Sequence, residues 1–190
     1  MEVKETARNY NTPGERYTYS EYAQWSDEHR YELIDGFAYM MSAPSMSHQR
    51  ILQELFRKFA DYLDEKPCEV FIAPCDVCLS GKGDDDDTVV QPDIFIVCDE
   101  SKITEKYCNG APDLIIEVLS PSTAKLDRMK KLNKYLQAGV REYWIADPID
   151  KGVVVHLLED GKYVVNAYDE NETISVNVLE GCDIALSDIF

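Results

Sequence analysis

Two acidic residues, Asp93 and Glu117, stand in segments that otherwise have the pattern of buried strands. Asp93 follows Pro92 and opens the apolar run "IFIV", and Glu117 interrupts "LIIEVLS". An ionised carboxylate in an apolar interior is costly unless it is paired or coordinates a cation. Mg²⁺ or Mn²⁺ would relieve this cost and the repulsion between two neighbouring acids, because these ions prefer carboxylate and water oxygens. Pairing with an arginine, or a wet strand end, is the alternative for either acid.

A third candidate, Lys131, lies in the helix that the pattern predicts over residues 123–138. At 100° per residue, the apolar side and the solvated side of this helix separate, and Lys131 belongs to neither. It lies with small residues and Tyr135, on a side that could approach another element and place the ammonium group in a site. A surface ion pair with Asp127, four residues earlier, is the alternative.

These side chains would be positioned by a mixed α/β domain. The pattern predicts, in order, a short helix capped by Ser20, a hairpin turning at Asp35-Gly36, an amphipathic helix over residues 47–64, three apolar strands, the helix 123–138 ended by Gly139, another strand and a β meander. The three strands, "EVFIAPCDVCL", "VVQPDIFIV" and "DLIIEVLS", suit a sheet covered on both faces. We expect one domain over residues 1–190, with at most residues 1–16 as a flexible N-terminal segment.

Charge limits the functions that the chain can perform. The 190 residues are 45% hydrophobic and carry a net charge of -17, from 19 basic and 36 acidic residues. Such a surface repels nucleic acid unless a local basic patch, a divalent cation or a partner protein supplies positive charge. The acidic run Asp84–Asp87 is interpreted as a solvated loop, with weak cation binding as the alternative. Because neither a signal segment nor a membrane-spanning run is recognisable, we expect a cytoplasmic protein that does not enter the membrane.

The cysteines fit that compartment. They lie mostly in apolar segments without a compact disulfide framework, so we expect reduced thiols at all six positions: Cys68, Cys75, Cys78, Cys98, Cys108 and Cys182. Cys75 and Cys78 have CxxC spacing, but neither a second such pair nor clustered histidines accompany them. Zinc or redox chemistry is therefore the minor alternative.

Six segments of the chain carry a family resemblance through their order and spacing: "YELIDG", "SAPSMSHQRI", "QPDIFIV", "GAPDLIIEVLSPST", "DRMKKLNKY" and "AGVREYWIADP". From about Tyr17 to Leu158 the sequence resembles the Uma family of restriction endonucleases, a branch of the PD-(D/E)XK nuclease superfamily. The resemblance implies a restriction-endonuclease-like mixed central β-sheet flanked by helices, with additional C-terminal strands. It also implies a Mg²⁺- or Mn²⁺-dependent endonuclease acting on nucleic acid, DNA more than RNA.

The resemblance assigns roles to the residues introduced above. Asp93 matches the aspartate of the first motif and Glu117 the acid of the second, which would hold the metal together with the carbonyl group of Val118. The superfamily's usual lysine position, two residues after the second acid, is Leu119 here. The matching lysine is instead Lys131 in the following helix, which would orient the attacking water or stabilise developing charge.

Two upstream residues and a basic segment complete the implied site. Glu32 matches an upstream acid that would complete the metal's outer shell or place a second ion, and His48 matches a recurring histidine that would contact phosphate or assist proton transfer. Otherwise Glu32 would be a surface strand acid, and His48 would make a local hydrogen bond. Nucleic acid would meet the basic residues of "KLDRMKKLNK", namely Lys125, Arg128, Lys130 and Lys134.

Two other functions remain open from the sequence. The net charge and the displaced lysine also suit a nuclease-fold binding or regulatory protein that acts through a partner without turnover. An acidic cation-binding protein is a third reading, for which Asp84–Asp87 would have to bind metal. Whether the nuclease fold cleaves nucleic acid or only binds a partner, exposed strand edges in the C-terminal meander favour a homodimer.

Overall fold

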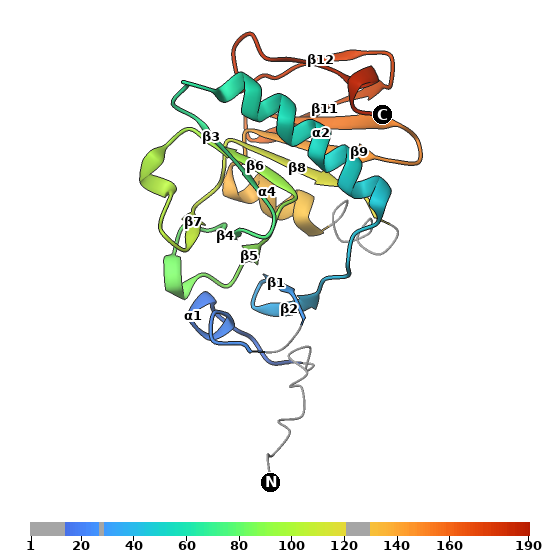
Figure 1. Cartoon of the computed structure of the whole chain (residues 1–190). Coiled ribbons are helices and arrows are strands. Elements are labelled where there is room, and N and C mark those ends of the chain that lie inside the picture. The colour runs from blue at the N-terminus through green and yellow to red at the C-terminus, as the bar shows by residue number, and fades with distance from the viewer. Residues whose placement is uncertain (1–13, 27–28, 121–129) are drawn as a thin grey trace.

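The computed structural model describes residues 14–26, 29–120 and 130–190 (Figure 1). Its helices are α1 (Tyr19–Tyr22), α2 (Met46–Leu63) and α4 (Leu132–Ala138), with 3₁₀ turns η1 (Gly83–Asp85), η2 (Glu100–Lys102) and η4 (Leu186–Asp188). Its strands are β1 (Tyr31–Ile34), β2 (Phe37–Met40), β3 (Glu69–Ile72), β4 (Asp76–Cys78), β5 (Val89–Val90), β6 (Ile94–Val97), β7 (Tyr107–Asn109), β8 (Leu114–Val118), β9 (Glu142–Asp147), β10 (Gly152–Glu159), β11 (Lys162–Asp169), β12 (Thr173–Ser175) and β13 (Asp183–Ala185). The fold is mixed α/β, as predicted.

The central sheet has six strands in the order β11-β10-β9-β8-β6-β3, with β8 and β9 parallel and the other neighbours antiparallel. Alternate residues of β6 and β8 enter two different cores. Ile94 and Ile116 pack in the core that contains Leu55 and Phe59 of α2, whereas Phe95 and Ile115 pack on the other face with Tyr135 of α4. The sheet is therefore covered on both faces, which explains the uninterrupted apolar runs.

Two of the predicted strands are each split between two sheets. The run "EVFIAPCDVCL" is interrupted at Pro74 and forms β3 and β4. The run "VVQPDIFIV" is interrupted at Pro92 and forms β5 and β6. Both breaks occur at proline because proline cannot donate a hydrogen bond to a strand ladder. Strands β4 and β5 join a second, five-stranded sheet in the order β2-β1-β5-β4-β7, and β12 and β13 form a small third sheet. Figure 1 shows the β1–β2 hairpin and the C-terminal strands at opposite ends of the molecule.

The helices follow the predicted periodicity with changes at their ends. The cap of α1 is Thr18, whose backbone N donates to Glu21 Oε2 at 2.9 Å, so the prediction of Ser20 was wrong. Helix α2 confirms the amphipathic segment. Gly139 ends α4, as predicted, and adopts a left-handed φ of 84°. Part of the predicted helix 123–138 lies outside the described residues, as do most of residues 1–16. Among the described helices, none is long and apolar enough to cross a membrane.

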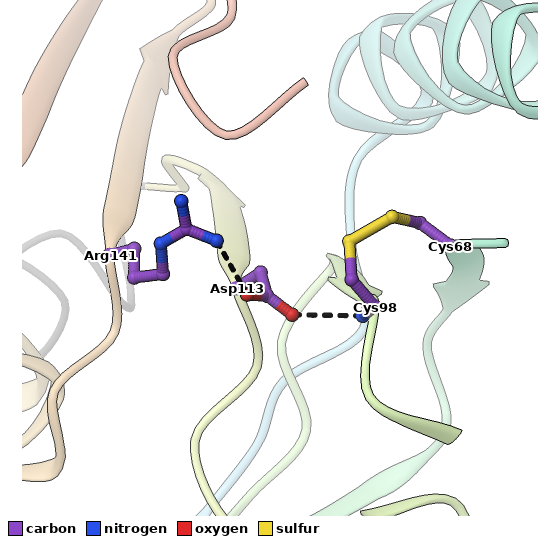
Figure 2. Close-up of a disulfide and its surroundings, with 4 residues drawn as sticks. All are labelled: Cys68, Cys98, Asp113 and Arg141. Carbon is purple, nitrogen blue, oxygen red and sulfur yellow. Dashed lines mark hydrogen bonds and ion pairs between the residues drawn. A yellow bond between two sulfur atoms is a disulfide. The ribbon is translucent and has the colours of Figure 1, made fainter. Parts of the chain in front are cut away.

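A disulfide corrects the prediction of six reduced cysteines (Figure 2). Cys68 and Cys98 are bonded, while Cys75, Cys78, Cys108 and Cys182 are free. The antiparallel pairing of β3 with β6 places Glu69 opposite Val97, so the two bonded cysteines are the next residues outward on each strand. This pairing was missed because it depends on the strand register and not on cysteine spacing.

The acidic run before β5 is only partly solvated. Asp84 and Asp85 are exposed, as predicted, but Asp86 is fully buried. Its carboxylate accepts hydrogen bonds from the backbone N of Ser80 at 2.8 Å and of Thr88 at 2.9 Å. Asp86 therefore stabilises the turn between β4 and β5, and it is not a cation ligand of a solvated loop.

Candidate active site

Asp93 and Glu117 lie side by side at the end of two paired strands. Ile94 of β6 is the antiparallel partner of Ile116 of β8, so Asp93 and Glu117 occupy the next opposing positions. Opposing residues of an antiparallel pair project to the same face of the sheet. Glu117 is buried, whereas the side chain of Asp93 is 18% exposed. The predicted approach of the two acids on neighbouring strands is confirmed by this register.

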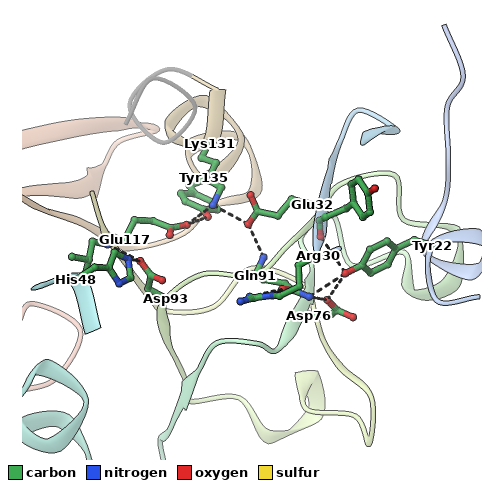
Figure 3. A network of polar contacts seen from close by, with 12 residues as sticks. Tyr22, Arg30, Glu32, His48, Asp76, Gln91, Asp93, Glu117, Lys131 and Tyr135 are labelled. Carbon is green, nitrogen blue, oxygen red and sulfur yellow. Dashed lines mark hydrogen bonds and ion pairs between the residues drawn. The ribbon is translucent and has the colours of Figure 1, made fainter. Parts of the chain in front are cut away.

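Lys131 lies between two buried carboxylates (Figure 3). Its Nζ is 2.9 Å from Glu117 Oε1 and 2.8 Å from Glu32 Oε1. Lys131 is 2% exposed, so the alternative of a surface lysine is wrong. Its position immediately before α4 carries the ammonium group over the end of β8, on the side of the helix shared with Tyr135.

Glu32 enters the site from the second sheet. It is 1% exposed, which excludes the alternative of a surface strand acid. Its Oε1 accepts a hydrogen bond from the backbone N of Gln91 at 2.8 Å as well as contacting Lys131. Glu32 therefore ties the lysine to the five-stranded sheet. Sequence reasoning missed the role of Gln91, and the available signal was its place in "QPD", where it lies two residues before Asp93.

Tyr135 is a further site residue to which the sequence analysis assigned no role. Its hydroxyl donates to Glu117 Oε1 at 2.8 Å, from one helical turn after Lys131. Burial, together with the charges of Glu117 and Glu32, raises the pKa of Tyr135 well above its ordinary value. The phenol therefore stays protonated and acts as a donor. The four-residue spacing from Lys131 was the signal for this shared orientation.

His48 and a backbone amide hold Asp93. His48 Nε2 is 3.0 Å from Asp93 Oδ2, and the backbone N of Val118 donates to the same oxygen at 2.8 Å. The backbone N of His48 also donates to the capping residue Ser45, so the predicted local hydrogen bond exists alongside the contact across the site. His48 is 5% exposed, and its Nδ1 is buried without a hydrogen-bond partner among the described residues.

One cleft of about 460 Å³ is lined by five of the predicted site residues: Glu32, His48, Asp93, Glu117 and Lys131. Among the residues that the structure describes, there is no group of three or more His, Cys, Asp or Glu side chains that could hold a metal ion. Asp93 and Glu117 nevertheless supply two hard carboxylate donors at adjacent positions, and Val118 lines the same cleft. This donor set fits Mg²⁺ or Mn²⁺, because Mg²⁺ commonly binds through one or two carboxylates and keeps several waters.

The basic segment contributes less free charge than the sequence implied. Lys130 is exposed and its Nζ lies 4.4 Å from the ring centroid of Tyr39, in a cation–π contact. Lys134 is ion-paired with Asp35 of the hairpin, which compensates its charge. Two further predicted nucleic-acid contacts, Lys125 and Arg128, lie outside the described residues.

Comparison with known proteins identifies relatives by sequence. Two uncharacterised proteins of Synechocystis sp. (strain PCC 6803) are similar to the chain. One is 26% identical over 188 residues, covering 97% of this chain and 96% of the relative. The other is 25% identical over 135 residues, covering 68% and 74%.

A solved structure has the same fold. It is a crystal structure of "a putative nuclease belonging to DUF820" from Anabaena variabilis, which superposes with a TM-score of 0.74 at 21% identity and covers 92% of this chain and 97% of that one. Residues 19–187 also match the Uma2 family model, described as "Putative restriction endonuclease". Since the match spans most of the sequence, the chain belongs to the Uma2 family.

Proposed function

We propose that this protein is a metal-dependent endonuclease that hydrolyses phosphodiester bonds in nucleic acid, DNA more than RNA. The observation that supports this best is the meeting of Asp93, Glu117 and Lys131 in one cleft, in a chain of a nuclease family. In hydrolysis of a phosphodiester, two adjacent carboxylates can bind the metal ion and a positioned ammonium group can stabilise the developing charge.

Each residue of the cleft has a part in the proposed reaction. Asp93, Glu117 and the carbonyl of Val118 would hold a divalent ion, which when bound polarises the scissile phosphate and lowers the pKa of the attacking water. Lys131 is fixed by two carboxylates and would stabilise charge developing on the phosphoryl oxygens.

The other residues position these groups. His48 contacts the carboxylate of Asp93, and in the proposal it would contact phosphate or assist proton transfer. Tyr135 holds Glu117, and Glu32 holds Lys131 in place. Glu32 accordingly acts in the proposal by positioning the lysine, since its observed partners are Lys131 and the backbone of Gln91.

The direct test is cleavage of plasmid DNA, single-stranded DNA and RNA at low salt in Mg²⁺ and in Mn²⁺. Wild type should cut, and EDTA, Asp93→Asn and Lys131→Met should each abolish cutting. Asp188→Asn and Lys151→Met are matched controls, because both side chains are about half exposed and neither lines the cleft. Full metal-dependent activity in both site variants would refute the proposed mechanism.

A binding or regulatory protein that acts through a partner is the second candidate. It is favoured by the charge compensation of Lys131 and Lys134, which lowers the free positive charge that the described basic segment offers in a protein of net charge -17. Specific binding of nucleic acid or of a partner protein, without cleavage in any metal, would support this candidate against the endonuclease.

We further propose that the active form is a homodimer paired through β11. This strand is an edge of the six-stranded sheet, and Val164 and Val165 near its middle are 42% and 55% exposed. An exposed apolar edge strand is a template for pairing with another chain, and two paired sites suit cutting of both DNA strands. Light scattering should give a dimer for wild type and a monomer for Val165→Lys, and a wild-type monomer would refute this assembly.

A further inference from the structure

Arg30 is an exposed residue whose guanidinium group is nevertheless held in one orientation. It immediately precedes β1, and both Nε and Nη2 donate to the side-chain oxygen Oε1 of Gln91, at 3.0 Å and 2.6 Å. Because the acceptor is a neutral amide, these contacts fix the guanidinium plane without neutralising its charge. In this respect Arg30 differs from Lys131 and Lys134, which contact carboxylates.

The orientation of Gln91 is set by its other contacts (Figure 3). Its Nε2 donates to Asp76 Oδ1 at 2.8 Å and to the hydroxyl of Tyr22 at 3.0 Å, which directs Oε1 toward Arg30. Its backbone N donates to Glu32. A single buried residue therefore holds both the exposed arginine and the carboxylate that positions Lys131, so Arg30 has a defined place relative to the site.

Arg30 lines two neighbouring hollows. One is the cleft that contains Asp93 and Lys131. The other has a volume of about 240 Å³ and includes the aromatic residues Trp25 and Tyr31 in its wall. A polymer that extends from the cleft toward the second hollow would pass the guanidinium group, and its backbone phosphate is the group that a fixed arginine recognises.

We infer that Arg30 forms a phosphate-binding subsite for the phosphodiester group next to the scissile one. The inference rests on the proposed function and adds to it a contact on the substrate outside the metal and lysine site. Guanidinium carries five N–H donors in a plane, and the two contacts with Gln91 use two of them. The remaining donors can bind two phosphate oxygens. A fixed cation in the wall of the cleft also gives this acidic protein a local attraction for nucleic acid.

The test measures binding separately from cleavage. A fluorescently labelled single-stranded oligonucleotide is titrated with the full-length protein in EDTA, and its anisotropy is followed over a series of salt concentrations. Arg30→Gln should weaken binding severalfold and reduce the slope of log K against log salt concentration by about 0.7, the value for one phosphate contact on a single strand. Arg57→Gln is the matched control, because this arginine is 60% exposed on α2 and is absent from both hollows.

Cleavage measurements then separate this inference from the proposed function. In a cutting enzyme, Arg30→Gln should raise KM more than it lowers kcat, and Arg30→Lys should recover part of the loss because it keeps the charge without the planar fork. An unchanged salt slope in a folded Arg30→Gln variant, or a wild type that does not bind the oligonucleotide, would overturn the subsite. Binding that depends on Arg30 in a protein that cuts nothing would retain the subsite and refute the endonuclease.

Discussion

Replacing Lys131 with methionine tests the electrostatics of the cleft most directly. Methionine keeps the length of the side chain and removes the ammonium group that lies within 3 Å of both Glu117 and Glu32. Both acids are almost fully buried, at 4% and 1% exposure. The variant therefore leaves two carboxylates in the interior without their shared cation.

Removing one partner of a buried ion pair costs about 3–5 kcal/mol, because the remaining charge is desolvated and uncompensated. We expect Lys131→Met to lose about that much unfolding free energy at pH 7. The loss should shrink on acidification, because a buried carboxyl group that has lost its cation favours the neutral form, and the neutral form does not require the cation.

Urea denaturation followed by tryptophan fluorescence measures the loss of unfolding free energy at pH 7 and its change with pH, because Trp144 is fully buried in the core. The control Lys151→Met removes an exposed partner of Glu170 and should change the unfolding free energy by less than about 1 kcal/mol. Glu32→Gln in the Lys131→Met background should restore part of the stability, since it removes one of the two unpaired charges. A loss below about 1 kcal/mol at pH 7, or a loss that grows on acidification, would refute the buried triad.

Three further outcomes follow from contacts described above. Tyr135→Phe should cost about 1.5–3 kcal/mol in urea unfolding at pH 7, because it removes the hydrogen bond to Glu117. The difference from wild type should shrink above about pH 10, because the raised pKa of the buried phenol makes the wild type lose stability there. A difference independent of pH would contradict this. Asp86→Ala should lower the unfolding free energy by more than about 2 kcal/mol because buried backbone N–H groups lose their acceptor, whereas exposed Asp85→Ala should have little effect. Cys98→Ser should cost about 3–4 kcal/mol in thermal or urea unfolding of the oxidised protein, and an equal stability with and without reductant would show that the bond is not formed.

Much of the local structure could be predicted from the sequence because it depends on neighbouring residues. The turn at Asp35-Gly36 needs two positive φ angles, which are 53° and 79° in the structure and which aspartate and glycine tolerate. The amphipathic spacing of α2 and the end of α4 at Gly139 have similarly local causes. The acids at Asp93 and Glu117 were recognisable because a carboxylate in an apolar strand has few stable explanations.

The partners of those residues were decided by the tertiary structure. His48 meets Asp93 across 45 residues, and Arg30 meets Gln91 across 61, so no local spacing connects them. The bond between Cys68 and Cys98 likewise depends on the register of β3 with β6. Register is set when the hydrophobic faces of the whole sheet pack, and a shift by one residue would turn each side chain to the opposite face. The sequence by itself therefore determined which chemical groups were available and on which elements they lie, and only the packing of the two sheets against α2 and α4 decided which of them meet.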